Sequence, residues 1–558
     1  MPSDRRVALL ARDLVWEDAY DASVPFSYAV SKLEASLRSA PDLKDVEVRV
    51  IDLQSDDPDA FMAEIEAFKP TMVGTSTYIW SAAVFGEVAR RVKRWNPRTG
   101  FMMGGPAARP SVFALPPYAP NAEFIDGLVT GEGEEVIRAA VRAHSAAAGD
   151  DGWARNIAGM HVRSPNGPWQ LTAPQQQPCI NRYASPYHLG IVPRGGVGYL
   201  ESFRGCPMRC SFCQWGDARP DRVHDEDYLV AHLEGLKASK VDLVYVVDAA
   251  FNLSPRAFRN LAAAERQVRA LADCKVLGHL YPTVLTDDHL AFFDGLGQAE
   301  INMGLQSIHP ELLTKLGRPF DVERFHHVIG QVRQRYRVSV EIILGLPGDT
   351  PEGFRHTLER SIELADRVRV FYCLALPDAM LETAAADGVD FDPTTFEVIS
   401  APGWSASALQ SEWRRVRDLA VTMHRAQMGP NWCEFDTTHP APAPEPARPQ
   451  APPAFPESLR DRLQDAISGT AMGWRLGQVR GSGEHLLLDL SGRTGQLVLE
   501  IAMSHPAKKR FSEHDGIAYS YRGDAPTDTA DLADFIARLH ARVYAHLPSM
   551  LHAPSDGP

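Results

Sequence analysis

The chain has 558 residues, which suggests three or four domains of about 150 residues each. Its formal net charge is −14, and no block is rich in Lys and Arg, which argues against nucleic acid as a partner because that affinity depends on basic residues. The cysteine count of seven is odd and low for this length, so it argues against a disulfide framework and favours a reducing compartment with free or metal-bound thiols.

The N-terminus has a short apolar run closed by charged residues, without the longer apolar region and cleavage site of a secretory signal. No later segment approaches the roughly 18 apolar residues that are needed to span a bilayer. We therefore expect a soluble, cytoplasmic chain without a membrane partner.

Residues 1–145 alternate apolar runs with amphipathic segments, which is typical of a doubly wound, Rossmann-like α/β domain. The apolar runs predict strands at residues 6–11, 46–53, 71–78, 100–105 and 123–131, and the amphipathic segments predict helices at residues 27–40, 58–68 and 82–95. Loops rich in Gly, Ser and Thr follow the carboxyl ends of these strands, where open parallel sheets bind ligands. This pattern predicts a cofactor-binding domain.

Residues 146–198 have weaker periodicity and are expected to form a linker with some strand content. From residue 199 to residue 430 the alternation resumes, and helix-like segments follow the apolar strands. These strands are predicted at residues 241–252, 275–286, 299–307, 338–348 and 367–377, after a first strand near residues 196–205. Buried parallel strands with crossover helices favour a partial (β/α)6 TIM barrel.

Residues 431–456 are rich in Pro and Ala and predict an extended spacer. Residues 457–558 predict a small α+β domain that begins with a helix. It continues with a strand pair at residues 485–490 and 496–503 and ends with an amphipathic helix at residues 531–547.

The run "ESFRGCPMRCSFCQWG" places Cys206, Cys210 and Cys213 within eight residues. A structural zinc site would need four protein ligands, usually from two pairs, and there is no second pair. The remaining cysteines are scattered: Cys179, Cys274, Cys373 and Cys433. Iron–sulfur clusters are usually held by four thiolates, so three would leave one iron open to a further ligand.

The run "RGCPMRCSFCQWG", with Phe212 before the third cysteine and a barrel strand before the loop, resembles the radical S-adenosylmethionine (radical SAM) enzymes. The resemblance implies a 4Fe-4S cluster on Cys206, Cys210 and Cys213. In that family the fourth iron binds S-adenosylmethionine, which is cleaved to a 5′-deoxyadenosyl radical. It also implies an external electron donor of the flavodoxin or ferredoxin type.

Later segments of the predicted barrel resemble the cofactor-binding strand ends of the same family. The residues that the resemblance implies near S-adenosylmethionine are Asp248, Gln306, Ser307, Gly345, Leu346 and Pro347. Ordinary strand-to-helix turns also use Gly and Pro, and Asp248 could instead cap a loop, so both interpretations stay open.

The segments "VGTSTYIWSA", "GGPAARP" and "GLVTGEGEEVI" resemble the cobalamin-binding domain of the cobalamin-dependent radical SAM branch. Glycine-rich turns allow the backbone to approach a large ring closely. The residues implied at cobalamin are Tyr78, Trp80, Gly104, Gly105, Pro106, Gly131, Glu132 and Gly133.

The Asp-x-His-x-x-Gly motif with which many cobalamin carriers ligate cobalt does not occur in residues 1–150. His144 and His161 are interpreted as satisfied surface histidines. Cobalamin is therefore expected base-off, with Tyr78 or Trp80 covering its lower face. Core packing at the sheet end is the alternative role for these two aromatic residues.

The two cofactors together imply transfer of a methyl group to a carbon, with sp³ carbon favoured, in a natural-product intermediate, an amino acid or a peptide. The alternatives are ring contraction or cyclisation without methyl transfer, methylation of an indole carbon without hydrogen abstraction, and a non-catalytic cofactor sensor. No catalytic side chain is predicted.

Overall fold

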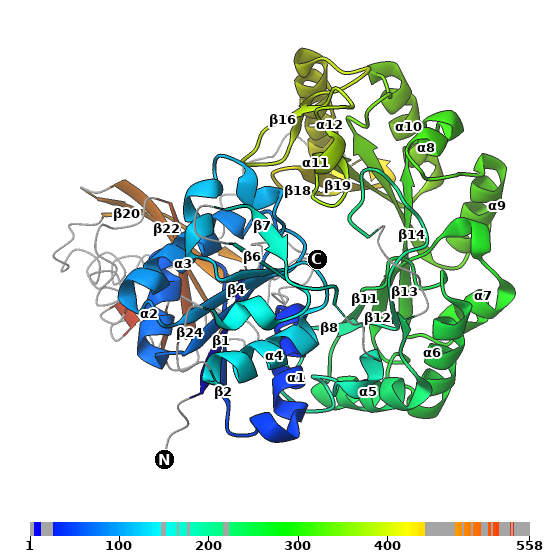
Figure 1. Cartoon of the computed structure of the whole chain (residues 1–558). Helices are drawn as coiled ribbons and strands as arrows, with labels where there is room; N and C mark the ends of the chain where they lie inside the picture. Colours follow the sequence, from blue (N-terminus) through cyan, green and yellow to red (C-terminus); the bar gives the residue numbers. More distant parts are fainter. Residues whose placement is uncertain are drawn as a thin grey trace. The chain divides into compact units, whose positions relative to one another are not determined.

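The computed structural model describes residues 5–12, 26–146, 152–163, 167–175, 179–215, 222–440, 475–482, 485–492, 495–503, 512–514, 517–523, 536, 539 and 540. The chain divides into two compact units, Met1–Pro442 and Ala443–Pro558. The first unit holds two large sheets, one in the N-terminal part and one in the barrel that follows (Figure 1).

The N-terminal sheet has the strand order β2-β1-β3-β4-β5-β6-β7, and β1 to β5 run parallel. Its strands are β1 (Arg6–Arg12), β2 (Glu47–Leu53), β3 (Met72–Ser76), β4 (Gly100–Gly104), β5 (Gly127–Val129), β6 (Met160–Arg163) and β7 (Trp169–Leu171). Its helices are α1 (Tyr28–Ser39), α2 (Pro58–Phe68), α3 (Ala82–Trp95) and α4 (Gly133–Ala146). Along β1, Val7 and Leu9 pack with α1 and α4, whereas Ala8 and Leu10 pack with α2 and α3. Both faces are covered, which confirms the doubly wound fold that the sequence predicts.

Strands β6 and β7 lie within residues 146–198, for which the sequence predicts a linker with some strand content. They pair antiparallel with β5 and with each other and so extend the N-terminal sheet. Each has four residues or fewer, which is too short for a clear period-two pattern.

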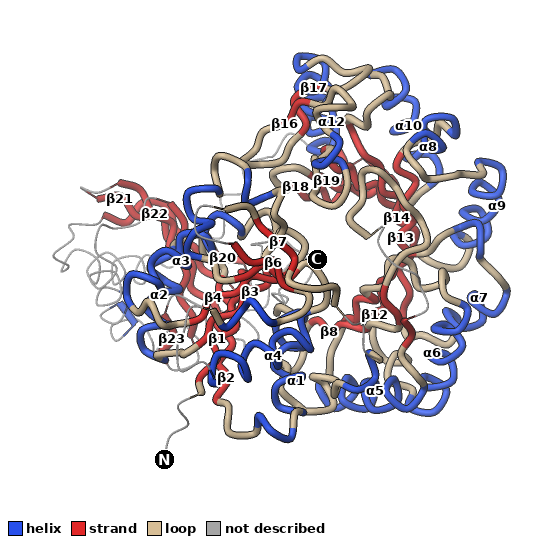
Figure 2. The backbone as a smooth tube through the Cα atoms, in the orientation of Figure 1, coloured by secondary structure: helices blue, strands red, loops and turns tan. Residues whose placement is uncertain are grey.

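The second sheet has the strand order β18-β19-β15-β14-β13-β12-β11-β8. Its parallel strands are β8 (Val197–Leu200), β11 (Leu243–Val246), β12 (Lys275–His279), β13 (Gln298–Gln306), β14 (Arg337–Leu344) and β15 (Arg367–Tyr372). The helices between and after them are α5 (Glu226–Ser239), α6 (Pro255–Val268), α7 (Asp287–Asp294), α8 (Pro310–Lys315), α9 (Val322–Arg333), α10 (Pro351–Leu364) and α12 (Ala406–Thr422). The strands curve inside an outer layer of helices, as expected for a partial (β/α)6 barrel (Figure 2).

Two antiparallel strands, β18 (Met423–Met428) and β19 (Trp432–Pro440), continue the barrel sheet beyond β15. Strand β19 therefore occupies the first part of the segment 431–456 that the sequence analysis assigns to a spacer. Its buried Glu434 and Asp436 receive hydrogen bonds from Arg369 and Arg367, respectively, which explains how a strand with acidic residues fits inside the protein. The rest of the expected spacer lies outside the described residues.

The segment between β15 and α12 returns to the N-terminal sheet. It contains α11 (Met380–Thr383), β16 (Asp390–Phe391) and β17 (Val398–Ser400). Phe396 on this segment is fully buried and belongs to the hydrophobic cluster of the N-terminal sheet. Its ring stacks on Tyr118 with a centroid distance of 6.0 Å.

The C-terminal unit has an antiparallel sheet with the strand order β20-β21-β22-β24-β23. Its strands are β20 (Arg475–Ser482), β21 (His485–Gly492), β22 (Gly495–Met503), β23 (Ser512–His514) and β24 (Ile517–Gly523). Strands β21 and β22 are the predicted pair, and the alternate residues Leu488, Leu490, Leu499 and Ile501 are buried. The helix expected after residue 457 lies outside the described residues, and so does most of the helix expected at residues 531–547.

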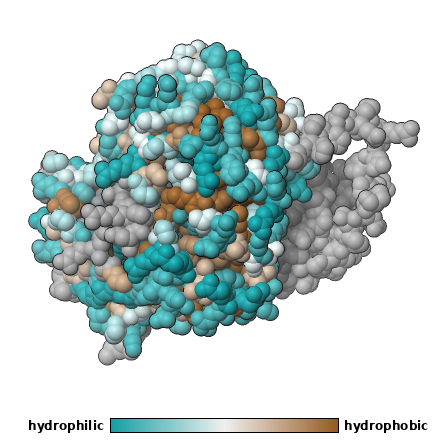
Figure 3. Space-filling view, turned by 90° about the vertical axis from the view of Figure 1, so that its right-hand side faces the viewer, coloured by the Kyte–Doolittle hydropathy of each residue, from teal (hydrophilic) through white to brown (hydrophobic). Residues whose placement is uncertain are grey.

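No helix within the described ranges is both long and apolar enough to cross a membrane. The face in Figure 3 is largely hydrophilic, with hydrophobic residues gathered near its middle.

Candidate functional site

The three clustered cysteines lie in the loop that follows the first barrel strand, after the short strand β9 (Phe203–Arg204). Cys210 is buried, whereas Cys206 and Cys213 are half-buried. Burial raises the pKa of the Cys206 thiol and raises the pKa of Cys213 to about 11, and the backbone amides of Met208 and Trp215 oppose these rises by hydrogen bonding. Arg318 also lowers the pKa of both thiols.

The loop is held against the end of α8. The amide of Ser211 donates to the carbonyl of Leu316 at 3.0 Å. Gly317 has a φ of +73°, and a Cβ atom there would lie 2.3 Å from the carbonyl oxygen of Arg209. Only glycine fits this close approach, so the barrel fixes the path of the cysteine loop.

The donor set fits an iron–sulfur cluster better than a single metal ion. In the part of the chain that the structure describes, no three His, Cys, Asp or Glu side chains gather in the geometry of one metal ion. A 4Fe-4S cluster needs a different arrangement, because each thiolate binds a separate iron atom. The thiols of Cys206 and Cys213 are partly accessible and lie near the cationic Arg318, and the buried Cys210 supplies the third thiol.

Gln306 and Arg318 line the end of β13 near the cysteine loop. Gln306 has a φ of +68°, and the register between β13 and β14 shifts there. Both side chains lie beside Gly304, since a Cβ on that glycine would be 2.6 Å from Gln306 Nε2 and 3.3 Å from Arg318 Nη2. Among the described residues, the buried Gln306 Oε1 and Arg318 Nε atoms have no hydrogen-bond partner. These two groups suit a polar ligand such as S-adenosylmethionine.

The other residues implied at S-adenosylmethionine have partners within the protein. Ser307 is fully buried and accepts a hydrogen bond from the amide of His309 at 3.3 Å. The side chain of Leu346 is also fully buried, and its carbonyl accepts a hydrogen bond from Trp404 Nε1 at 3.1 Å. Gly345 has a φ of +93°, so its turn requires glycine. Near Leu346, a ligand would therefore meet backbone and the neighbouring Pro347 rather than the leucine side chain.

Asp248 holds the start of the cysteine loop. Its carboxylate accepts hydrogen bonds from the Ser202 amide at 2.8 Å, from the Ser202 hydroxyl at 2.5 Å and from the Phe203 amide at 3.3 Å. Burial raises the pKa of Asp248 to about 7, despite these hydrogen bonds. In this geometry Asp248 caps the loop, which is the second of the two roles that the sequence leaves open for it.

The implied cobalamin residues lie on loops at the carboxyl edge of the N-terminal sheet. Tyr78 and Trp80 stack with a centroid distance of 4.4 Å and an interplanar angle of 8°, and Trp80 is 38% exposed. The amide of Thr77 bonds to the carbonyl of Gly104, and a Cβ on Gly105 would lie 2.6 Å from the Thr77 carbonyl oxygen. The loop thus presents close-packed backbone that continues into Pro106.

One observation at this edge fits a large polar cofactor. The hydroxyl of Ser76, at the end of β3, is buried and has no hydrogen-bond partner within the described ranges. Beside it are a glycine turn and the aromatic stack, in which Tyr78 is half-buried and Trp80 is exposed, and both features suit a flat ring.

The third loop implied at cobalamin, residues 131–133, makes its contacts with other parts of the protein. A Cβ on Gly131 would lie 2.1 Å from Gln175 Oε1, and Gln175 also bonds to the backbone of Glu132. The Glu132 carboxylate forms ion pairs with Arg204 and Arg222. Gly133 begins α4.

Neither histidine is in a strand-end loop. His144 Nε2 lies 3.0 Å from the carbonyl oxygen of Arg98 in the N-terminal unit, and its side chain therefore has a partner, as expected. The interpretation of His161 as a satisfied surface histidine is wrong, because it is half-buried and its Nδ1 has no hydrogen-bond partner among the residues described.

Two residues outside the predicted set join the site to the N-terminal sheet. Gln214, next to Cys213, donates from Nε2 to the Pro106 carbonyl at 3.2 Å and to the Pro377 carbonyl at 3.0 Å. Arg204, two residues before Cys206, forms ion pairs with acidic residues of the N-terminal part. Both contacts join residues more than 60 positions apart, and no local pattern signals them.

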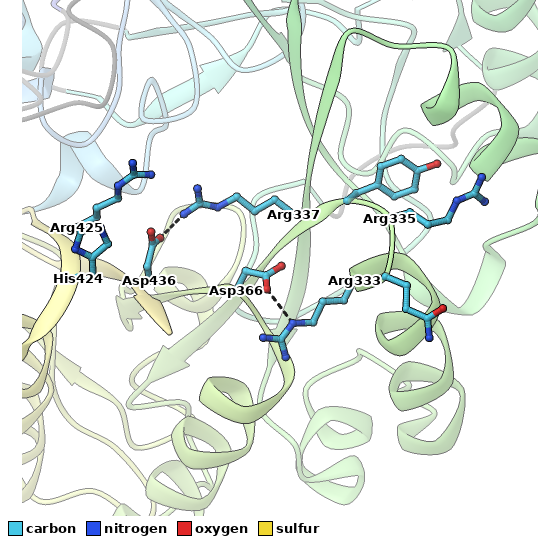
Figure 4. A pocket seen from close by; sticks show the side chains of 9 residues that line it. Arg333, Arg335, Arg337, Asp366, His424, Arg425 and Asp436 are labelled. Atoms are coloured by element: carbon cyan, nitrogen blue, oxygen red, sulfur yellow. Dashed lines mark hydrogen bonds and ion pairs between the residues drawn. The ribbon is translucent and has the colours of Figure 1, made fainter. Parts of the chain in front are cut away.

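A pocket of about 490 Å³ lies at the opposite end of the barrel (Figure 4). Its lining includes Arg337 at the start of β14 and Asp366 just before β15, which are amino ends of parallel strands. The ion pairs Arg337–Asp436 and Arg333–Asp366 cross it. Ligands of parallel α/β folds bind at the carboxyl ends, so this pocket is separate from the cysteine site.

Two family models match the chain. Residues 200–360 match the radical SAM superfamily, and residues 31–141 match the B12 binding domain. These matches confirm the predicted cofactors, namely a 4Fe-4S cluster, S-adenosylmethionine and cobalamin.

The chain is also similar to individual proteins. It is 28% identical over 343 residues to the 2-(S-pantetheinyl)-carbapenam-3-carboxylate methyltransferase of Streptantibioticus cattleyicolor, covering 56% of this chain and 48% of the relative. It is 26% identical over 347 residues to the cobalamin-dependent radical SAM methyltransferase TokK of Streptomyces tokunonensis, with the same two shares. The chain spans about half the length of these curated relatives.

A solved structure shares the fold. The radical S-adenosylmethionine methyltransferase TsrM from Kitasatospora setae, with tryptophan and a SAM analogue bound, matches with a TM-score of 0.57 at 19% identity. The match covers 75% of this chain and 89% of TsrM.

Proposed function

We infer that this chain, which belongs to the radical SAM superfamily and carries a B12-binding domain, is a cobalamin-dependent C-methyltransferase. It transfers a methyl group to a carbon, with sp³ carbon favoured, of a natural-product intermediate, an amino acid or a peptide. One observation carries this proposal: a single compact unit holds both the three-cysteine loop and a domain that matches the B12 binding family.

The cofactors supply the reactive groups when bound: the cluster with S-adenosylmethionine supplies a radical, and cobalamin supplies an activated methyl group. The chain's own residues bind these cofactors and orient them. Cys206, Cys210 and Cys213 would hold three irons, and Gln306 with Arg318 would orient the polar part of S-adenosylmethionine. Asp248 keeps the start of the loop in place through its three hydrogen bonds.

At the N-terminal edge, the backbone of Gly104, Gly105 and Pro106 and the stack of Tyr78 on Trp80 would hold the corrin ring. We propose that cobalamin binds base-off, without His144 or His161 as a ligand. Electron paramagnetic resonance of the cob(II)alamin form tests this directly, since hyperfine splitting from a protein nitrogen would refute it.

The remaining expectations concern partners and location. All seven cysteines are free thiols in the structure, which supports a reducing, cytoplasmic compartment. We propose a small-molecule or peptide substrate and an external one-electron donor of the flavodoxin or ferredoxin type.

The test of the proposed function uses S-adenosylmethionine with a ¹³C methyl group. The reduced, reconstituted protein is incubated with tryptophan and with a carbapenam as trial substrates, because relatives are named for them. We expect a product heavier by one labelled methyl group for an accepted substrate, together with 5′-deoxyadenosine and S-adenosylhomocysteine. An accepted substrate that is converted without gaining label would contradict methyl transfer.

The same measurement separates the alternatives. A labelled product without 5′-deoxyadenosine indicates the indole-type reaction, and a rearranged product without label indicates ring contraction or cyclisation. If S-adenosylmethionine is not cleaved at all under reduction, the sensor alternative is favoured.

A further inference from the structure

A buried charge network joins the start of the cysteine loop to the N-terminal sheet. At its centre, Arg204 contacts three carboxylates: Nη1 lies 3.0 Å from Glu132 Oε2, Nη2 lies 2.5 Å from Glu134 Oε1, and Nε lies 2.9 Å from Glu201 Oε1. Glu132 precedes α4 and Glu134 is in its first turn, whereas Glu201 follows β8 in the barrel. Arg204 therefore connects both parts of the unit.

Further side chains complete the network. Lys32 on α1 forms an ion pair with Glu201, and Arg222 forms one with Glu132. The three cations Lys32, Arg204 and Arg222 balance the three carboxylates. Little of this charge reaches solvent, since the side chains of Lys32, Glu134, Glu201 and Arg204 are 9%, 6%, 15% and 16% exposed.

The electrostatics show that Glu201 and Glu134 are held in their charged forms. Burial alone would raise the pKa of Glu201, but Arg204 and Lys32 outweigh burial and hold it well below its usual value. Burial would likewise raise the pKa of Glu134, and Arg204 holds it below its usual value. A guanidinium that bonds several carboxylates in fixed directions constrains geometry, whereas an apolar contact would tolerate sliding.

Arg204 lies close in sequence to the cysteine loop, so the network constrains the position of that loop. One residue, Gly205, separates it from Cys206, and its acidic partners flank the strand-end loop between β5 and α4. We propose that Arg204 is a positioning residue, which sets the distance between the cysteine loop and the cobalamin-binding edge. This rests on the proposed function, in which two cofactors must face one substrate and be positioned to within about 1 Å.

The first test measures the distance between the two cofactors. The full chain is loaded with iron and sulfide and with hydroxocobalamin and then reduced, and pulsed electron paramagnetic resonance records the coupling between cluster and cob(II)alamin. We expect one narrow distance in the wild type, and in Arg204→Gln a distribution broadened or displaced by about 1 Å or more. Arg204→Lys keeps the charge but loses the bidentate geometry, so we expect an intermediate width.

The second test needs no cofactor. In the metal-free full chain, we expect Arg204→Gln to raise hydrogen exchange at least about fivefold in both residues 201–213 and 130–136, because the network stabilises both segments. Arg90→Gln is the matched control: it removes an ion pair to Glu87 that remains within α3, and both segments should exchange as in the wild type. Glu134→Gln replaces Arg204→Gln if the latter fails to fold.

The outcomes separate this proposal from the proposed function. If Arg204→Gln or Glu134→Gln binds both cofactors with an unchanged distance distribution, or leaves exchange unchanged, the positioning role is overturned. If the wild type takes up no cluster or no corrinoid, the proposed function fails, while the exchange experiment still decides whether Arg204 joins the two segments.

Discussion

Two of the junctions between the N-terminal sheet and the barrel use opposite chemistry. At one, the buried charges around Arg204 join the start of the cysteine loop to α1 and α4. At the other, Phe396 inserts into the apolar core beneath α2 and α3, far along the chain from the cysteine loop. Apolar burial supplies most of the free energy that holds domains together, whereas a buried ion pair fixes direction with little net stability. The charged junction lies beside the site, where direction matters most.

Phe396→Ala should have the largest effect on stability. The ring is fully buried and stacks on Tyr118, so its removal leaves a cavity in the N-terminal core. We expect the free energy of unfolding of the first unit to fall by about 3–5 kcal/mol, measured by urea denaturation. Phe396→Leu, which keeps most of the apolar volume, should lose clearly less. Equal losses for the two variants would show that packing is not the cause.

Glu134→Gln tests the charged junction. It removes one buried carboxylate and leaves Arg204 with a surplus of positive charge, which we expect to destabilise the unit by about 3 kcal/mol. In a double-mutant cycle with Arg204→Gln, the double variant should lose less than the sum of the two single losses. Strict additivity would contradict direct coupling of the two residues.

The charged junction should also respond to pH. Burial lowers the pKa of His224 to about 4, against a usual value near 6.5, although Glu201 opposes the shift. Between these values the unfolded chain binds a proton that the folded protein does not. The neutral His224 therefore contributes fully to the free energy of unfolding above pH 6.5, and this contribution is lost as the pH falls towards 4. We expect a loss of about 2 kcal/mol between pH 7 and pH 5. His224→Gln should reduce the measured pH dependence in urea denaturation, to which the buried His232, with its pKa lowered to about 3, also contributes. An unchanged slope would rule out His224 as a source.

Tyr118→Phe should have the smallest effect. It removes only the hydrogen bond from the Tyr118 hydroxyl to the carbonyl of Thr394, at 3.0 Å, and keeps the ring against Phe396. We expect a loss of about 1 kcal/mol in the free energy of unfolding. A loss as large as that of Phe396→Ala would mean that the hydrogen bond, and not the ring, holds this junction.

The sequence predicts what is local and periodic. The parallel strands of both sheets follow from their apolar runs, and the cysteine loop follows from a spacing within eight residues. The expected linker is given some strand content, but the sequence predicts neither the positions of β6 and β7 nor the strand β19. The first two are too short to show a period, and β19 carries acidic residues whose partners, such as Arg367 and Arg369, come from a distant strand.

The candidate site divides in the same way. Gln306 could be predicted from the resemblance, and its strained backbone and its Oε1, which lacks a partner in the part of the chain that the structure describes, support a ligand. For Glu132, the motif implied cobalamin, but its carboxylate binds Arg204 and Arg222. Long-range pairing between side chains depends on how the two sheets meet, and no local sequence pattern reveals it.

The central claim is that one chain binds a cluster through three cysteines and cobalamin through its N-terminal sheet. It is tested most directly by counting iron, sulfide and corrinoid in anaerobically reconstituted wild type and in the Cys206→Ala, Cys210→Ala, Cys213→Ala triple variant. We predict about four irons, about four sulfides and about one corrinoid in the wild type. In the triple variant we predict the loss of iron and sulfide with corrinoid retained. Iron that survives the triple substitution, or a wild type without corrinoid, would contradict the claim.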